Sequence, residues 1–327
     1  MMSQKPSVAV LGLGAMGHAF AANLLKNGFE THVWNRTASR GEALVKAGAK
    51  QGKTVRETVE GVDVVIAMLA DGPTTQSVFS GDDGLLAGLK QGGIIAQMGT
   101  IGVEANEALM ALVKQQRPDA VFFDAPVSGT KTPAENAQIV VLASGDREAG
   151  PAVEPVFAAI SKGVKWLGEA GRASKMKLVV NAWLISMMEG IAESAQLADE
   201  FGFTTDDLWN VLEGGPLAPG YIKVKMDMFK SGDYTPQMHL TWALKDINLA
   251  LKAGEKLQLP LMNSISQTWQ SAVDAGYGEQ RKPRPGTWQR QDNLLPFATS
   301  LSGGARLRDR SPALADHGKA AERRDSG

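Results

Sequence analysis

The stretch that most limits how this chain can fold lies near its amino terminus, where a β-branched run passes directly into three spaced glycines. Residues Ser7–Leu11 read SVAVL, and the following GLGAMG places Gly12, Gly14 and Gly17 in G-x-G-x-x-G spacing. A helical pattern and a second strand pattern, ETHVWNR, come next. The spacing predicts a βαβ unit whose glycines make a tight turn, admit a pyrophosphate and let helix and strand pack closely.

The same unit predicts which nucleotide is bound. We expect the glycine loop to contact the cofactor through Gly12, Leu13, Gly14, Ala15, Met16 and Gly17. An NAD site usually has an acidic residue at the end of the second strand, but this strand ends in Asn35, Arg36 and Thr37. Arg36 can pair with a 2′-phosphate, and its neighbours can donate hydrogen bonds to it, which predicts NADP(H). The alternative is that Arg36 is an ordinary solvated loop charge.

Strand and helix patterns alternate up to about residue 168, which indicates an open parallel sheet with right-handed crossovers. In such sheets ligands bind beyond the carboxyl ends of the strands. Two loops end strands on that side, at residues 98–100 and 126–131. The further strands of this sheet are predicted at 63–69, 92–100, 120–130, 137–145 and 162–168.

From Gly171 onward the strand patterns stop and only helical patterns follow, led by a long apolar segment that reaches about Gly202. Because this segment is apolar on nearly every side, it predicts a buried helix. Lys177 and Asn181 are four residues apart, so they share one face. A lysine here must be partnered, shifted in pKa or open to a cleft, although a lysine that snorkels at the helix start is the plainer interpretation.

The chain is therefore predicted to have an α/β Rossmann-type N-terminal domain with a parallel sheet (1–170), followed by an all-α C-terminal domain built on a long helix (171–280) for substrate and dimerisation. Residues 281–327 are expected to be an atypical, disordered tail. The apolar surface of the second domain predicts a homodimer or higher homo-oligomer.

Composition excludes several functions. The chain has no cysteine, which rules out disulfides and a thiol nucleophile, and its four histidines are too dispersed to suggest a metal site. A formal net charge of −1 without a basic stripe argues against nucleic acid as a partner. The most apolar segment carries charged residues, so no membrane partner is expected, and the default location is cytoplasmic.

Four stretches in order, GLGAMG, DAPVSGTKTPAENAQ, GRASKMKLVVN and LKDINLA, resemble the β-hydroxyacid dehydrogenase family over residues 7–278. The match is most similar to the glyoxylate/succinic semialdehyde reductase branch. The resemblance implies that Lys177, rather than Lys175, is the catalytic lysine, with Asn181 beside it. It also implies that a loop holds the substrate carboxylate and that other residues contact the cofactor. These are Ser128, Gly129 and Thr130 for the substrate, and Leu69, Ala70, Thr100, Lys245 and Asp246 for the cofactor.

The sequence departs from the family pattern at Gly99, Ala173, Met238 and Trp242, which puts the substrate, but not the reaction class, in question. The expected function is NADPH-dependent reduction of a small carboxylate-bearing aldehyde, glyoxylate or succinic semialdehyde, with Lys177 as general acid. The alternatives are a 3-hydroxyisobutyrate-type NAD(P)-dependent dehydrogenase and a non-catalytic NADP-binding module. An imine reductase shares the plan, but the retained Lys177 argues against it.

Overall fold

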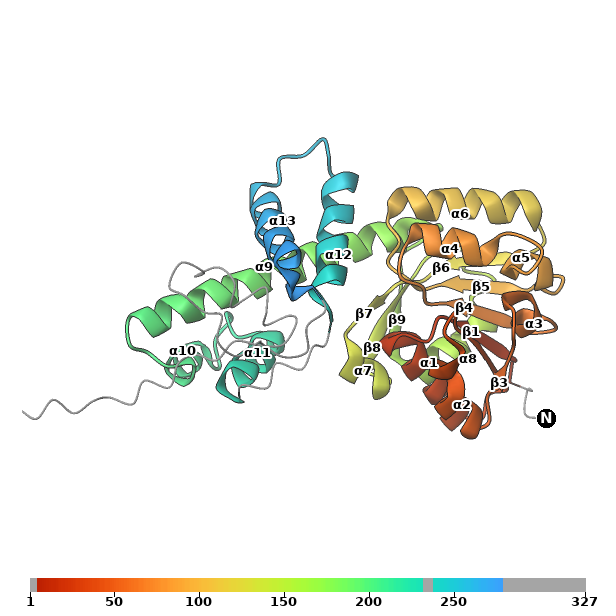
Figure 1. Cartoon of the computed structure of the whole chain (residues 1–327), viewed down its shortest axis with the longest axis horizontal. Coiled ribbons are helices and arrows are strands. Elements are labelled where there is room, and N and C mark those ends of the chain that lie inside the picture. Colours follow the sequence, from red (N-terminus) through yellow and green to blue (C-terminus); the bar gives the residue numbers. More distant parts are fainter. Residues whose placement is uncertain (1–4, 232–237, 279–327) are drawn as a thin grey trace, which may run out of the picture.

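The computed structural model describes residues 5–231 and 238–278, and it divides into a sheet-containing part and a helical part joined by one long helix (Figure 1). The strands are β1 (Val8–Leu11), β2 (Thr31–Trp34), β3 (Lys50–Gln51), β4 (Val64–Ala67), β5 (Ile94–Gln97), β6 (Val121–Asp124), β7 (Val127–Ser128), β8 (Ile139–Ala143) and β9 (Ser161–Trp166). The helices of the sheet-containing part are α1 (Ala15–Lys26), η1 (Ala38–Gly41), α2 (Glu42–Lys46), α3 (Val55–Val59), α4 (Gly72–Phe79), α5 (Leu85–Gly88), α6 (Val103–Gln116), α7 (Lys131–Glu135) and α8 (Gly150–Ile160).

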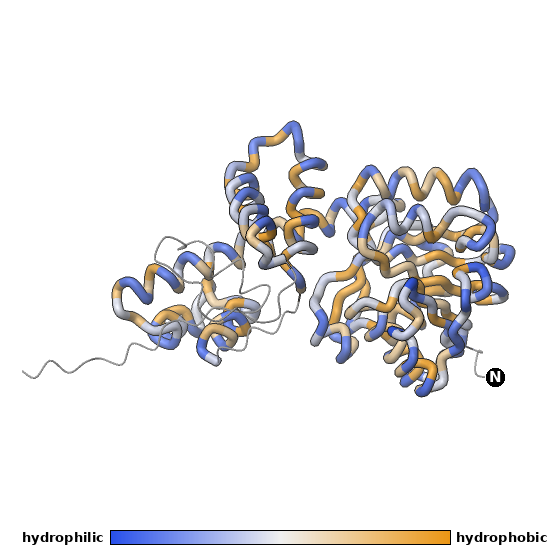
Figure 2. The backbone as a smooth tube through the Cα atoms, in the orientation of Figure 1, coloured by the Kyte–Doolittle hydropathy of each residue, from blue (hydrophilic) through white to orange (hydrophobic). Residues whose placement is uncertain are grey.

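The main sheet has six strands in the order β3-β2-β1-β4-β5-β6, and every pair is parallel. Strands β1, β4 and β5 are buried on both faces, which explains their continuous apolar runs. Alternate strand residues pack against α1 and α8 on one face and against α3 to α6 on the other. Figure 2 shows these strands as an apolar interior beneath helices of mixed polarity. The predicted Rossmann-type fold is confirmed, with the added short strand β3.

The single-sheet prediction is wrong for the last strands. β7, β8 and β9 form a separate three-stranded sheet in which β7 runs antiparallel to β8, whereas β8 and β9 are parallel. The short link through α7 explains the reversal, because a parallel connection needs a crossover of a dozen or more residues. An isolated antiparallel bridge between Asp124 and Ser144 joins the two sheets.

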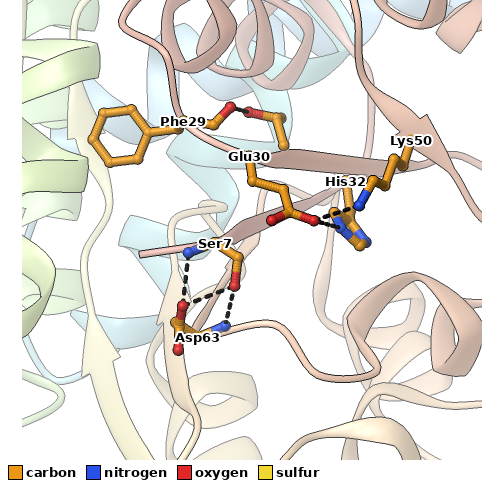
Figure 3. A network of polar contacts seen from close by, with 7 residues as sticks. Ser7, Phe29, Glu30, His32, Lys50 and Asp63 are labelled. Carbon is orange, nitrogen blue, oxygen red and sulfur yellow. Dashed lines mark hydrogen bonds and ion pairs between the residues drawn. The ribbon is translucent and has the colours of Figure 1, made fainter. Parts of the chain in front are cut away.

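A polar network closes the amino-terminal edge of the main sheet (Figure 3). The Ser7 amide and hydroxyl donate to Asp63 Oδ2 at 2.7 and 2.8 Å, and the Asp63 amide donates back to Ser7 Oγ at 3.0 Å. Glu30 pairs with His32 and Lys50 on the neighbouring strands. These contacts fix the strand starts and leave the opposite, carboxyl edge of the sheet for ligands.

The helical part is built on α9 (Arg172–Glu200), which begins against the sheets and extends through the helices that follow (Figure 1). Its core packs α9 against α12 and α13 around the fully buried Trp269, whose Nε1 donates to Glu189 Oε2 at 3.1 Å. The remaining helices are α10 (Thr205–Leu212), α11 (Gly220–Ser231), α12 (Leu240–Ala253), α13 (Pro260–Ala272) and the π-helical turn η2 (Val273–Tyr277).

The expectation that α9 is buried on nearly every side is wrong for the single chain. Val179, Trp183 and Leu197 are 64%, 66% and 56% exposed. The neighbouring helices cover one side of α9 only, so an apolar stripe remains on the other.

Two expectations are not tested by the fold. The tail, residues 281–327, lies outside the described residues, and the domain boundaries at 170 and 280 stay predictions. Within residues 5–231 and 238–278, no helix is long and apolar enough to cross a membrane.

Candidate active site

The glycine loop between β1 and α1 has the shape that a dinucleotide requires. Gly12 has φ 93°, and a Cβ atom there would lie 2.3 Å from the Met68 carbonyl oxygen. A Cβ on Gly17 would lie 1.9 Å from the Gly12 carbonyl oxygen. Gly14, by contrast, faces open space and is the N-cap of α1 without a side-chain cap. The loop therefore presents bare backbone at a helix N-terminus, which fits a pyrophosphate.

A pocket of about 480 Å³ opens at the end of β2. Arg36 lines it from the loop after β2, and Lys53 lines it from the loop after β3, so two cations face one space. The amide of Asn35 accepts from Leu13 N at 2.9 Å and donates to the Thr37 carbonyl at 3.0 Å, so it ties the glycine loop to this turn. The position and charge of the pocket suit the 2′-phosphate of NADP. Lys53 was not foreseen, because β3 carries too weak a strand signal to place the loop after it.

Lys177 lies on the first turns of α9, where it is partly buried. Burial lowers the pKa of its ammonium group to about 8, the Asp246 carboxylate opposes this change, and the nearby Lys245 adds to it. Lys175 differs in each respect, since its side chain is 58% exposed and its ammonium group pairs with Glu107 at 3.2 Å. The lysine that shares a face with Asn181 is thus the one held in a low-polarity environment.

A chain of contacts links Asn181 on α9 to α12. Asn181 is buried, and its Nδ2 donates to Asp246 Oδ2 at 2.7 Å. The other oxygen of Asp246 lies 3.1 Å from the ammonium group of Lys245. These contacts fix the orientation of the Asn181 amide within one helical turn of Lys177.

Lys245 also joins the helical part to the main sheet. Its ammonium group donates to the Ala70 carbonyl at 2.9 Å and to the Thr100 carbonyl at 2.5 Å, just past the ends of β4 and β5. Leu69 precedes Ala70 in the same loop, which lies beside the glycine loop because β4 pairs with β1. The structure therefore brings the predicted cofactor residues of both parts together at the carboxyl edge of the sheet.

The predicted substrate loop, Ser128 to Thr130, begins on β7, which packs against α9. Gly129 has φ 136°, a conformation that favours glycine, and Thr130 is the N-cap of α7. Among the described residues, no hydrogen bond links this loop to Lys177 or Asn181. The loop contributes backbone and hydroxyl groups near the start of α9, and its contact with a carboxylate stays a prediction.

Sequence reasoning missed a buried carboxylate that anchors α9. Asp124 ends β6 with no exposed surface, and its oxygens accept from the Ser174 amide at 2.8 Å and the Ser174 hydroxyl at 2.6 Å. Ser144 on the second sheet donates to it at 3.2 Å. Burial raises the pKa of Asp124, and the hydrogen bonds from Ser174 and Ser144 oppose that change. Only the isolated aspartate at the end of an apolar strand hinted at this role.

A glycine cradle, a cationic pocket beside it and a low-pKa lysine at one sheet edge together define an NAD(P)-dependent oxidoreductase. Comparison with known proteins agrees. A family model described as the NAD binding domain of 6-phosphogluconate dehydrogenase matches residues 7–168. A second model, described as NAD-binding of NADP-dependent 3-hydroxyisobutyrate dehydrogenase, matches residues 171–282. The chain belongs to the β-hydroxyacid dehydrogenase family.

Individual relatives show how far the similarity extends. Glyoxylate/succinic semialdehyde reductase 1 of Arabidopsis thaliana is 35% identical over 278 residues, which cover 83% of this chain and 94% of the relative. A crystal structure of 3-hydroxyisobutyrate dehydrogenase from Salmonella typhimurium is 25% identical with a TM-score of 0.75, and the match covers 84% of this chain and 96% of that one. The reductive aminase of Aspergillus terreus in complex with NADPH and ethyl levulinate is 26% identical with a TM-score of 0.58, over 84% and 95% of the two chains.

The cofactor prediction, NADP(H), is confirmed: both family models are described as NAD-binding, the second of them for an NADP-dependent enzyme, and the reductive aminase was solved with NADPH. The chain's own residues fit it through the glycine cradle and the two cations of the pocket after β2. Within the described residues, no group of three or more histidine, cysteine or acidic side chains could hold a metal ion.

Proposed function

We propose that the protein reduces a small aldehyde carrying a carboxylate, of the glyoxylate or succinic semialdehyde type, to the hydroxyacid with NADPH. The observation that carries the proposal is the partly buried Lys177, whose pKa is lowered to about 8 beside Asn181 at the carboxyl edge of the sheet. The 35% identity to a glyoxylate/succinic semialdehyde reductase supports this substrate class.

In this proposal the bound cofactor supplies the hydride that reduces the carbonyl carbon. Lys177 Nζ donates a proton to the oxygen as negative charge develops there. Asn181, whose amide is held by Asp246, keeps the carbonyl oxygen within reach of Lys177. Ser128, Gly129 and Thr130 hold the substrate carboxylate through hydroxyl and backbone N–H groups, which orients the aldehyde toward the cofactor.

The direct test is absorbance loss of NADPH with a panel of carboxylate-bearing aldehydes, using wild type, Lys177→Ala and Lys175→Ala. Removing a general acid typically costs a factor of about 10² to 10⁴ in rate, so Lys177→Ala should lose most turnover and still bind NADPH. Lys175→Ala removes the same charge from the same helix but at an exposed position, and it should stay near wild type. Near-wild-type rates for Lys177→Ala would reject the catalytic assignment. Intact NADPH binding without turnover of any carbonyl would favour a non-catalytic NADP-binding module.

A second candidate is a 3-hydroxyisobutyrate-type dehydrogenase, favoured by the model that matches residues 171–282 and by the structural relative of that name. It predicts oxidation of 3-hydroxyisobutyrate with NADP⁺ at a kcat/KM above that for 4-hydroxybutyrate or glycolate. The opposite ranking would leave the aldehyde reductase as the better description.

We further propose that two copies of the chain associate through the exposed face of α9. Val179, Trp183 and Leu197 form an apolar stripe there that water would otherwise solvate. Sedimentation should give a dimer or larger for wild type and a smaller species for Trp183→Glu. A monomeric wild type would end this proposal. The cytoplasmic location and the absence of a nucleic-acid partner stay predictions.

A further inference from the structure

One face of α12 lies against the loops that follow β4 and β5 and against the start of α6. Residues 242, 245, 249 and 252 recur at helical spacing and therefore form a single stripe. At its far end Lys252 pairs with Glu104 at the start of α6. One turn earlier, a Cβ on Gly102 would lie 2.7 Å from Leu249 Cδ2, so the leucine fills the space that this glycine leaves. Going from Lys252 toward the start of α12, the stripe therefore contacts first the start of α6 and then the loop that follows β5.

The next turn of the stripe reaches the sheet edge itself, where Lys245 donates to the Thr100 and Ala70 carbonyls. Trp242 is one turn further on, and its ring centroid lies 5.8 Å from the Lys245 ammonium group. The indole is 40% exposed, and it lies outside the apolar core that Leu240, Ala243 and their neighbours form. A large, partly exposed aromatic side chain is therefore left beside Lys245, one of the groups expected to contact the reacting end of the cofactor.

We propose that Trp242 is the apolar wall of the substrate site and that it selects aldehydes whose hydrocarbon chain is long enough to lie against the indole. This inference rests on the proposed function for its substrate class. The carboxylate and the carbonyl are held by polar groups, so the methylenes between them are the part of the substrate that an indole can desolvate. A semialdehyde with two methylenes gains from this wall, whereas glyoxylate has none to offer.

The size of the effect follows from the transfer of methylenes out of water. Each buried methylene corresponds to a factor of about 4 in binding at 25 °C. Two methylenes packed against the ring correspond to a factor of about 15, and incomplete burial against a partly exposed indole reduces this to about 5 to 10. We therefore expect wild type to prefer succinic semialdehyde over glyoxylate, and Trp242→Ala to lower that preference by about 5- to 10-fold. Trp242→Phe keeps an aromatic wall and should retain most of it.

The experiment compares wild type, Trp242→Ala, Trp242→Phe and Trp209→Ala. Trp209 is the matched control. Its ring centroid also lies close to a lysine ammonium group, that of Lys223 at 5.5 Å, but Trp209 is on α10 and not on α12 beside Lys245. Two ratios are measured: kcat/KM for succinic semialdehyde over glyoxylate, and affinity of the NADP⁺ complex for 4-hydroxybutyrate over glycolate by calorimetry. Both ratios should fall in Trp242→Ala and stay unchanged in Trp209→Ala.

Several results would overturn the inference. Equal losses for both substrates with weaker NADPH binding would mean that the indole supports the cofactor instead. If Trp242→Ala lowers kcat/KM equally for both substrates and lowers stability, but leaves NADPH binding unchanged, the indole only supports the position of Lys245. A binding ratio that Trp242→Ala leaves unchanged, or no binding of either hydroxyacid, would also refute it. If wild type turns over neither aldehyde but Trp242→Ala still lowers the ratio of affinities for the two hydroxyacids, the proposed reaction is refuted and the proposed role of Trp242 is retained.

Discussion

Replacing Lys177 with methionine should stabilise the protein while it abolishes activity. Burial keeps the ammonium group of this lysine in a low-polarity environment, which lowers its pKa from 10.5 to about 8. One pKa unit corresponds to about 1.4 kcal/mol, so the charged form destabilises the native state by at most about 3 kcal/mol at pH 7. Because the Lys177 side chain is only partly buried, solvent screens part of this cost, and about 2 kcal/mol is a better expectation. Methionine has a similar length and no charge, so it removes this cost.

The pH dependence gives the prediction its sign. Between the native pKa of about 8 and the unfolded value of 10.5, the unfolded chain binds more protons at this lysine than the native one. The free energy of unfolding of wild type therefore rises with pH across this window, and Lys177→Met lacks that rise. The advantage of the variant should be largest below pH 8 and should shrink to less than about 1 kcal/mol by pH 10.

Urea unfolding of wild type, Lys177→Met and Lys175→Met at pH 7 and pH 10, without cofactor, tests the reasoning. Lys175 is exposed and paired with Glu107, so its replacement should change stability by less than about 1 kcal/mol at pH 7. Equal stability of Lys177→Met and wild type at pH 7 would refute the claim that the ammonium group is strained by burial. An advantage that is the same at pH 7 and pH 10 would locate the gain in packing instead.

Three other changes have defined outcomes. Arg36→Asp should weaken NADPH binding by about 10- to 100-fold and NADH binding far less, because a charge-assisted contact is worth about 1.5–3 kcal/mol; an unchanged cofactor ratio in fluorescence titrations would contradict it. Asp124→Asn should lower the free energy of unfolding by about 1–3 kcal/mol and reduce kcat, since an amide cannot accept every bond that Ser174 and Ser144 donate; calorimetry and steady-state rates measure both. With NADPH saturating, aldehyde reduction should fall as pH rises through about 8, and with NADP⁺ saturating, the reverse oxidation should rise, because Lys177 acts protonated in one direction and neutral in the other; a flat kcat profile from pH 7 to 9 would argue against the assignment.

Much of the fold could be predicted because its signals are local. The glycine spacing after β1 requires a backbone approach that any side chain would block, as the positions around Gly12 and Gly17 show. Helical spacing placed Lys177 and Asn181 on one face of α9, while the choice of Lys177 over Lys175 as the catalytic lysine came from the family resemblance and stays a prediction. Both spacings depend on residues within about one or two helical turns of each other.

What could not be predicted depends on contacts between distant segments. Asp124 and Ser174 lie 50 residues apart, so no local pattern shows that one anchors the other. The reversal between β7 and β8 depends on the short link through α7, and a two-residue strand leaves almost no periodic signal. The exposure of α9 depends on which neighbours cover it, and composition reports only that the helix is apolar.

The two bonds that Lys245 makes across the molecule have a consequence for how such a cleft can change over time. Both acceptors are main-chain carbonyls, those of Ala70 and Thr100, so the joint between the helical part and the sheet does not depend on the side chains at those positions. Lys245 can therefore go on holding the two parts in register while the side chain at Trp242, the wall proposed above, is exchanged. The contacts that join the two parts are thereby separate from the residue proposed to select the substrate, so substrate preference can change during evolution without loss of those contacts.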